Sequence, residues 1–224
     1  MIRAADSYEG AEHYLPARIT LKTLREAAQG CRGCDLYRNA TQAVIGEGPA
    51  PAPIMFVGEQ PGEQEDLAGR PFVGPAGRMF DKALAEVGIE RREVFVTNAV
   101  KHFKFTPRGK RRIHGKPTMR QVRACRPWLE AEIALVQPQM IVAMGATAAQ
   151  ALFGTAFRVS TQRGEPFECD WAPWCMATVH PSSLLRAPDE ESRRAMWARF
   201  VEDMQIVAAQ YRKTKSKQKA RMRK

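Results

Sequence analysis

The chain has 224 residues, 44% of them hydrophobic, which is enough to bury one full core and requires no second domain. Its formal charge of +11 at pH 7 is compatible with an anionic partner. The first 20 residues carry acids and bases but no apolar run, so we expect no cleavable leader and a cytoplasmic location. Residues 133–157 are uncharged, but Pro138, Gly145 and Gly154 interrupt them, which argues against a membrane span.

The spacing of apolar residues predicts helices that alternate with short strands. The expected helices cover residues 21–30, 76–87, 118–136, 146–152 and 189–211. The expected strands cover residues 54–57, 94–100, 140–144 and 176–179, with an irregular loop or short hairpin at 167–174. This order is typical of an α/β fold with a central four-stranded, mainly parallel sheet covered on both faces. We expect one such domain over residues 1–211.

Two segments concentrate the positive charge. Residues 212–224 contain eight Lys or Arg and no acid, and residues 101–126 contain ten and no acid. The first segment offers little to bury, so we expect a disordered basic tail. Such a tail either adds salt-dependent attraction to a polyanion or only keeps the protein soluble. The second segment also contains aromatic residues and histidines, and it lies between predicted elements.

Polar side chains follow or end three of the predicted strands. They are Glu59, Gln60, Glu63 and Asp66 after the first strand, Asn98 in the second, and His180, Ser182 and Ser183 after the last. Each of them alone is more often a turn or cap residue. Because the carboxyl ends of parallel strands meet at one edge of a sheet, together they predict a ligand pocket there. Gly58 and Gly62 would let backbone amides approach the ligand.

Five cysteines are present, and cysteines in a cytosolic protein are seldom paired as disulfides. Cys31 and Cys34 have the spacing of a metal or cluster chelate, with a redox pair as the alternative. Cys125 would be a third ligand. Cys169 and Cys175 are expected to be small core residues.

One set of motifs spans the chain from Cys31 to Arg186. It consists of Gly58-Glu59-x-Pro61-Gly62, Glu65-Asp66, Pro71-Phe72-Val73-Gly74, Asn98, Cys31-x-x-Cys34, Cys125-Arg126-Pro127 and His180-Pro181-Ser182. As a set, these motifs resemble the iron–sulfur uracil-DNA glycosylases of family 4. The resemblance implies a three-layer α/β/α sandwich, a [4Fe–4S] cluster and excision of uracil from DNA.

Two features differ from ordinary members of that family. Gln60 stands where those members have Ala, and they lack the basic loop 110–114, which ends in His114. Both features, with residues 101–105, are similar to the UdgX branch, whose members become covalently attached to uracil-containing DNA through the loop histidine. The resemblance therefore nominates His114 as a nucleophile. Without it, the loop would be interpreted as a plain phosphate-binding loop.

The resemblance also implies the ligands of the cluster, namely Cys31, Cys34, Cys125 and a fourth cysteine after the strand that carries Asn98. His102 occupies that fourth position. Either His102 binds iron through a ring nitrogen, or the cluster has an open site. We favour ligation, because histidine replaces cysteine on iron in known clusters. A structural role for the cluster is expected.

Recognition of uracil in DNA requires a flipped or single-stranded nucleotide, whose base is read along its Watson–Crick edge and stacked on an aromatic ring. Asn98 can donate to O4 and accept from N3–H. Phe72 is the stacking candidate, with plain core packing as the alternative. Glu63 or Gln60 is expected to lie against C5 and exclude thymine.

Cleavage of the glycosidic bond leaves negative charge on uracil and an electron-poor C1′. His180 and the amides of the 58–62 loop can stabilise the leaving oxygen. A neutral His114 could then attack C1′, with Glu59 orienting the imidazole or taking its proton and Asp66 in support. Gln60 cannot act as a base that delivers water.

Further side chains are candidates for contacts with the DNA backbone. They are Arg111, Arg112, Ser182, Ser183 and Arg186. The expected partner is uracil-containing DNA, single-stranded, with double-stranded DNA as an open alternative. We expect a monomer without membrane association.

The sequence is compatible with three functions. The first is a single-turnover uracil-DNA glycosylase that stays joined to DNA through His114. The alternative is a family 4 enzyme that releases uracil and leaves an abasic site. The third is a cluster-bearing DNA-binding module without catalysis.

Overall fold

The computed structural model describes residues 8–109 and 111–221. Its centre is a five-stranded sheet in the order β2-β1-β5-β7-β6. The strands are β1 (Ile54–Gly58), β2 (Phe95–Asn98), β5 (Met140–Met144), β6 (Phe167–Cys169) and β7 (Ala172–Thr178). All neighbouring pairs are parallel except β6 with β7, which is antiparallel. The predicted α/β fold is confirmed, but the sheet has a fifth strand, because three residues of the expected hairpin region pair with β7.

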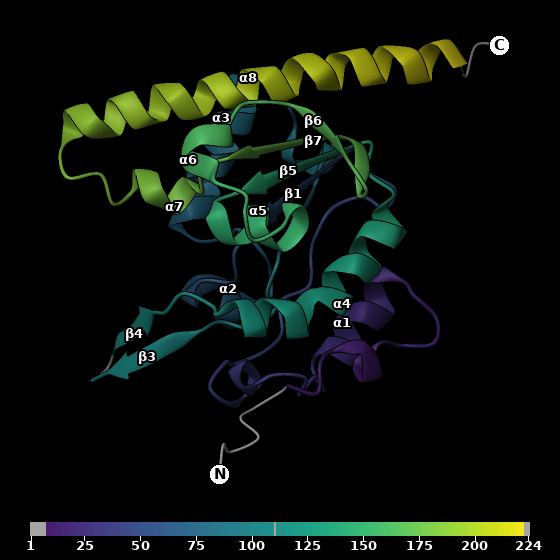
Figure 1. Cartoon of the computed structure of the whole chain (residues 1–224), viewed down its shortest axis with the longest axis vertical. Coiled ribbons are helices and arrows are strands. Elements are labelled where there is room, and N and C mark those ends of the chain that lie inside the picture. Colours follow the sequence, from purple (N-terminus) through teal and green to yellow (C-terminus); the bar gives the residue numbers. More distant parts are fainter. Residues whose placement is uncertain (1–7, 110, 222–224) are drawn as a thin grey trace.

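Helices cover both faces of this sheet (Figure 1). They are α1 (Leu21–Ala28), α2 (Glu63–Ala68), α3 (Pro75–Glu86), α4 (Met119–Val136), α5 (Ala146–Phe153), α6 (Val159–Gln162), α7 (Pro181–Leu184) and α8 (Glu190–Arg221), with short 3-10 turns at Glu12–Tyr14, Asp35–Arg38 and Arg91–Glu93. No helix within the described residues is both long enough and apolar enough to cross a membrane.

Alternating side chains of each parallel strand enter two separate cores. In β1, Ile54 and Phe56 pack into the core shared with α3 and α8, and Met55 and Val57 pack into the core shared with α4 and α5. None of these four side chains is exposed to solvent. Burial on both faces explains why the strand has a continuous apolar run. Because β1, β2, β5 and β7 are parallel, the polar residues that follow them lie at one edge of the sheet.

A third apolar cluster joins the N-terminal part of the chain to α4. Leu24 of α1 and Trp128 of α4 are fully buried in it, together with Cys31, Cys34 and Cys125. The N-terminal segment therefore packs directly against α4.

The basic segment 101–126 contains a hairpin that the sequence did not predict. Strands β3 (Phe105–Arg108) and β4 (Arg111–His114) pair antiparallel, with Phe105 opposite His114. The hairpin extends away from the body, at the lower left of Figure 1. Its strands are largely exposed and contain Pro107 and three arginines, so neither an apolar run nor strand propensity signals them.

Helix α8 continues to Arg221, so the prediction of a disordered segment was wrong for residues 212–221. Two contacts hold this extension, because Tyr211 Oη and Lys215 Nζ both donate to the carboxylate of Glu93, at 2.7 and 2.5 Å. Lys, Arg, Gln and Ala favour helix, and extending an existing helix needs no new nucleus. The last three residues of the predicted tail, 222–224, lie outside the described residues.

Candidate functional site

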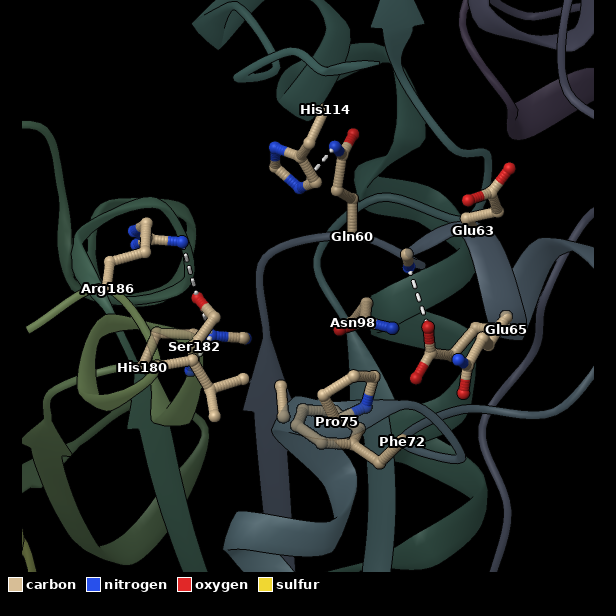
Figure 2. Close-up of a pocket in the computed structure, with 14 residues that line it drawn as sticks. Gln60, Glu63, Glu65, Phe72, Pro75, Asn98, His114, His180, Ser182 and Arg186 are labelled. Carbon is tan, nitrogen blue, oxygen red and sulfur yellow. Dashed lines mark hydrogen bonds between the residues drawn. The ribbon is translucent and has the colours of Figure 1, made fainter. Parts of the chain in front are cut away.

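A cavity of about 340 Å³ opens at the carboxyl-terminal edge of the sheet (Figure 2). Eight predicted site residues line it, and these are Gln60, Glu63, Phe72, Asn98, His114, His180, Ser182 and Arg186. They come from the ends of β1, β2, β4 and β7 and from the loops and helices that follow. A volume of this order suits a small organic ligand. The structure therefore brings together the strand ends that the sequence predicted to converge.

The cavity also has lining residues to which the sequence analysis gave no role. They are Gln64, Glu65, Pro75, Ala76 and Leu185, whereas Gly62, which also lines the cavity, was expected near the ligand. Figure 2 shows Phe72 and Pro75 on one side of the cavity, with Gln60 and His114 across from them.

Asn98 provides the clearest sign of a ligand. Its Oδ1 is the one buried side-chain polar atom that lacks a hydrogen-bond partner within residues 8–109 and 111–221. Leaving a buried acceptor unpaired costs about 1–3 kcal/mol. A Cβ atom at Gly58 would lie only 2.4 Å from this oxygen, so the site needs glycine there. The arrangement presents an acceptor to a bound N–H donor.

Phe72 forms the apolar wall next to Asn98. Its ring centroid lies 5.6 Å from that of Phe80 in the core and 6.0 Å from that of His180 in the cavity. The backbone of Phe72 has a φ of 56°, and a Cβ at Gly77 would lie 1.8 Å from the Phe72 carbonyl oxygen. Phe72 thus belongs both to the core and to the wall of the cavity.

Glu65 fixes the two loops that frame the entrance, a role that the sequence analysis missed. Its carboxylate accepts from Gly74 N at 2.7 Å and from Gly62 N at 3.1 Å. Its place at the third position of α2, just after a glycine-rich turn, is the capping pattern that could have identified it.

Gln60 attaches the β3–β4 hairpin to the edge of the sheet. Its Oε1 accepts from Lys104 N at 3.0 Å, which fixes the orientation of the amide. Its Nε2 donates to Gly115 O and lies 2.9 Å from His114 Nε2. Because an amide nitrogen only donates, His114 Nε2 must accept, and the ring proton lies on Nδ1. Burial lowers the pKa of His114, outweighing the opposite effect of Glu59, so the ring is neutral at pH 7.

Glu59 also approaches the Nε2 atom of His114. Its Oε1 is 3.8 Å from His114 Nε2, and its Oε2 accepts a hydrogen bond from Thr147 Oγ1 in α5. The sequence analysis missed Thr147, which has no local motif beyond its place in the first turn of a helix.

His180 is also held in one neutral form. Its Nδ1 accepts from Ser182 N at 3.2 Å and lies 2.8 Å from Ser182 Oγ, which leaves the proton on Nε2. Burial lowers the pKa of His180 to about 4, with smaller contributions from Arg186 and His114. Arg186 in turn donates to Ser182 Oγ at 3.1 Å.

Asp66 and Arg112 lie elsewhere than expected, outside the cavity lining. Asp66 is fully buried and accepts from Thr41 N and, at 2.6 Å, from Arg112 Nη1. The Arg112 guanidinium also packs over the rings of Phe103 and Phe105, 5.4 and 5.0 Å from their centroids. This pair joins the hairpin to α2, so Asp66 does not contact His114 and Arg112 is not presented to a phosphate. Arg111 is exposed on the other face of β4.

A second cavity of about 720 Å³ adjoins the first. Both are lined by Gln60, His114, His180, Ser182 and Arg186, and the second adds Glu59, Lys116, Thr147 and Ser183. His114 therefore stands at their boundary. The two cavities therefore form one continuous space at this edge of the sheet.

Cys31, Cys34 and Cys125 are free and buried in one apolar cluster. Cys31 Sγ accepts from Trp128 Nε1 at 3.3 Å, and Cys125 Sγ accepts from Lys101 N at 3.2 Å. Burial raises the pKa of Cys34 to about 11 and of Cys125 to about 12.

His102 is buried as well, and burial lowers its pKa to about 4. Within the described ranges, however, no three His, Cys, Asp or Glu side chains are arranged as a metal site.

Cys169 and Cys175 form a disulfide, so the expectation of unpaired core thiols was wrong for these two. The antiparallel pairing of β6 with β7 brings the two residues together, with Cα atoms 6.1 Å apart.

Comparison with known proteins gives consistent matches. The family model of the uracil DNA glycosylase superfamily matches residues 45–205. The type-4 uracil-DNA glycosylase of Thermotoga maritima is 39% identical over 175 residues, which cover 78% of this chain and 88% of that protein. The type-4 uracil-DNA glycosylase of Pyrobaculum aerophilum is 36% identical over 178 residues, covering 76% and 87%.

Proposed function

Since the chain belongs to the uracil-DNA glycosylase superfamily, we propose that it cleaves the N-glycosidic bond of uracil in DNA. The observation that carries this proposal is the unpartnered Asn98 Oδ1 at the floor of the cavity. The N3–H of uracil would satisfy it, whereas cytosine has no hydrogen at N3. The Phe72 wall supports stacking of a flipped base, and the adjoining second cavity leaves room for the rest of the strand.

Departure of uracil is supported by His180. Its Nδ1 is occupied by the Ser182 amide, so the Nε2–H is available as a donor to the uracil oxygen that gains charge. A neutral donor suits this task, since an imidazolium would add a buried charge.

The relatives are named as type-4 uracil-DNA glycosylases, which favours turnover with release of uracil and an abasic site. In that course Glu59, which lines the second cavity beside His114, would hold the water that attacks C1′. This is the first candidate.

The second candidate is covalent attachment through His114, and the contact between Gln60 and His114 favours it. The Nε2 lone pair of a neutral ring would exchange this hydrogen bond for a bond to C1′ as the bond from C1′ to N1 of uracil breaks. Uracil leaves with the electron pair, and His114 becomes an imidazolium that keeps its Nδ1 proton. The nearby Glu59 carboxylate would stabilise that positive charge.

One gel distinguishes these candidates. Purified protein is mixed with a labelled single-stranded oligonucleotide carrying one uracil, boiled in SDS and run under denaturing conditions. A slow band that requires uracil and disappears in His114→Ser supports attachment. Free oligonucleotide that becomes alkali-cleavable supports turnover. Unchanged DNA in both assays, with equal affinity for uracil and thymine DNA, would leave only a DNA-binding module.

A [4Fe–4S] cluster held by Cys31, Cys34 and Cys125 is part of the proposal, with His102 as the fourth candidate ligand. The donor chemistry fits such a cluster, since three buried thiols share one apolar cluster and two of them accept N–H donors, which tune cluster sulfurs. The thiols must lose their protons to bind iron. Iron and sulfide analysis of the protein, compared with His102→Ala, tests the cluster and the fourth ligand separately.

A further inference from the structure

A buried ion pair lies next to the strand that carries Asn98. Lys101 Nζ lies 2.6 Å from Glu132 Oε2 of α4, and neither side chain is exposed to solvent. Desolvation of two charges offsets much of their attraction, so stability alone does not account for this pair. Neither residue lines the cavity.

The ammonium group of Lys101 has an acceptor for each of its three hydrogens. Besides Glu132, it donates to Thr97 Oγ1 at 2.7 Å and to the main-chain oxygen of Asn98 at 2.6 Å. All of its donors are therefore used, and its direction is fixed. The contact with Asn98 reaches the residue whose Oδ1 is left for a ligand.

The peptide group between Asn98 and Ala99 is held at both ends. Its oxygen accepts from Lys101 Nζ, and its N–H donates to Gly58 O at 2.9 Å. Rotation of this peptide would break both bonds. The Cα atom from which the Asn98 amide projects is thereby fixed relative to β1.

Lys101 and Glu132 are anchored in turn. Lys101 N donates to Cys125 Sγ at 3.2 Å, and Lys101 O accepts from Val44 N at 2.8 Å. Glu132 Oε1 accepts from Gly46 N at 2.7 Å. The ion pair thus connects the floor of the cavity to α4 and to the 44–46 loop.

We propose that Lys101, held by Glu132, is a positioning residue that aims the Asn98 amide at the base. The inference rests on the proposed excision of uracil. It concerns the rate at which a bound uracil reacts, because these two fully buried side chains cannot reach a DNA phosphate.

The test uses the double variant Lys101→Met with Glu132→Gln. Glutamine keeps an acceptor for Gly46 N and places a donor near Thr97 Oγ1, and methionine keeps much of the buried volume. The donor to Asn98 O is lost. We expect the single-turnover excision rate at saturating DNA to fall about tenfold to hundredfold. Affinity for the same oligonucleotide with thymine in place of uracil should stay within about twofold.

The matched control makes the same two kinds of substitution, cation to methionine and carboxylate to amide, at another ion pair. Arg163 Nη2 lies 2.8 Å from Asp203 Oδ2, and Thr178 of β7 also donates to Asp203. In the sheet, β1 and β5 separate β7 from β2, the strand of Asn98. Arg163→Met with Asp203→Asn removes this pair and keeps an acceptor for Thr178. Its excision rate should remain within about twofold of wild type.

The outcomes are distinct. If wild-type protein does not act on uracil DNA, the proposed function fails. If wild type acts and the folded Lys101/Glu132 variant is equally fast, the positioning role is overturned. If that variant does not fold, Glu132→Gln alone replaces it, because it loosens the hold on Lys101 at constant volume. A wild-type rate in that variant would likewise overturn the proposal.

Discussion

The Nε2 atoms of Gln60 and His114 lie 2.9 Å apart, although the two residues are 54 positions apart in the chain. This contact joins the loop after β1 to the end of β4. It also decides the chemistry of the ring, since the Gln60 amide nitrogen can only donate and so requires a lone pair on His114 Nε2. The same side chain that attaches the hairpin therefore selects the neutral form that could act as a nucleophile.

Replacing Gln60 with Glu should reverse this selection. A carboxylate beside Nε2 favours the protonated ring and raises the pKa of His114. If His114 attaches to DNA as in the second candidate, we expect adduct formation at pH 7 to fall at least tenfold and to recover as pH rises through the new pKa. Measurement of the SDS-resistant band from pH 6 to 9 tests this. In Gln60→Ala the amount of SDS-resistant band should be reduced at every pH. Identical pH profiles for the two variants would show that Gln60 does not set the protonation of His114.

The sheet and much of the cavity lining could be predicted because their signals are local. The apolar run at Ile54–Val57 and the polar residues after it are adjacent in the sequence, and parallel strands direct such residues to one edge. The hairpin carries no such signal, since its strands are exposed and rich in arginine. The contacts of the hairpin, including Gln60 with His114 and Asp66 with Arg112, could therefore not be predicted from patterns of neighbouring residues.

Breaking the bond between Asp66 and Arg112 should release the hairpin. Arg112→Met keeps apolar contact with Phe103 and Phe105 but removes the only cation that an ion pair brings to the buried Asp66 in the described structure. We expect a cost of about 3–5 kcal/mol in unfolding free energy or local opening of the hairpin. Hydrogen exchange across Phe105–His114 and the rate of product formation from uracil DNA should change together.

Arg111→Met is the control for that variant, because Arg111 lies in the same strand and is exposed. It should leave hairpin protection unchanged, and it should weaken DNA affinity and make that affinity less dependent on salt. Equal hydrogen exchange in Arg112→Met and Arg111→Met would show that the ion pair does not hold the hairpin.

Thr147 should act through Glu59. Thr147→Val keeps the shape of the side chain and removes the hydroxyl that donates to Glu59 Oε2. A free Glu59 carboxylate has more than one orientation relative to His114, so we expect about a tenfold loss in the rate of product formation at saturating DNA. Thr147→Ser should restore most of the rate. A slow Thr147→Ser variant with normal stability would assign the effect to packing of the methyl group instead.

The depressed pKa of His180 predicts how stability depends on pH. Burial lowers this pKa to about 4, whereas an unfolded chain binds the proton near pH 6.5. Between these values the unfolded state holds more protons at this site, so stability falls as pH is lowered from about 6.5 to about 4. The contribution is absent above pH 6.5, where both states are neutral. His180→Gln should remove this part of the slope, and its unfolding free energy should therefore gain about 1–3 kcal/mol relative to wild type between pH 7 and pH 4. Urea unfolding at half-unit steps of pH measures the difference. If the unfolding free energies of the two proteins depend on pH in the same way, the pKa of His180 is not lowered by folding.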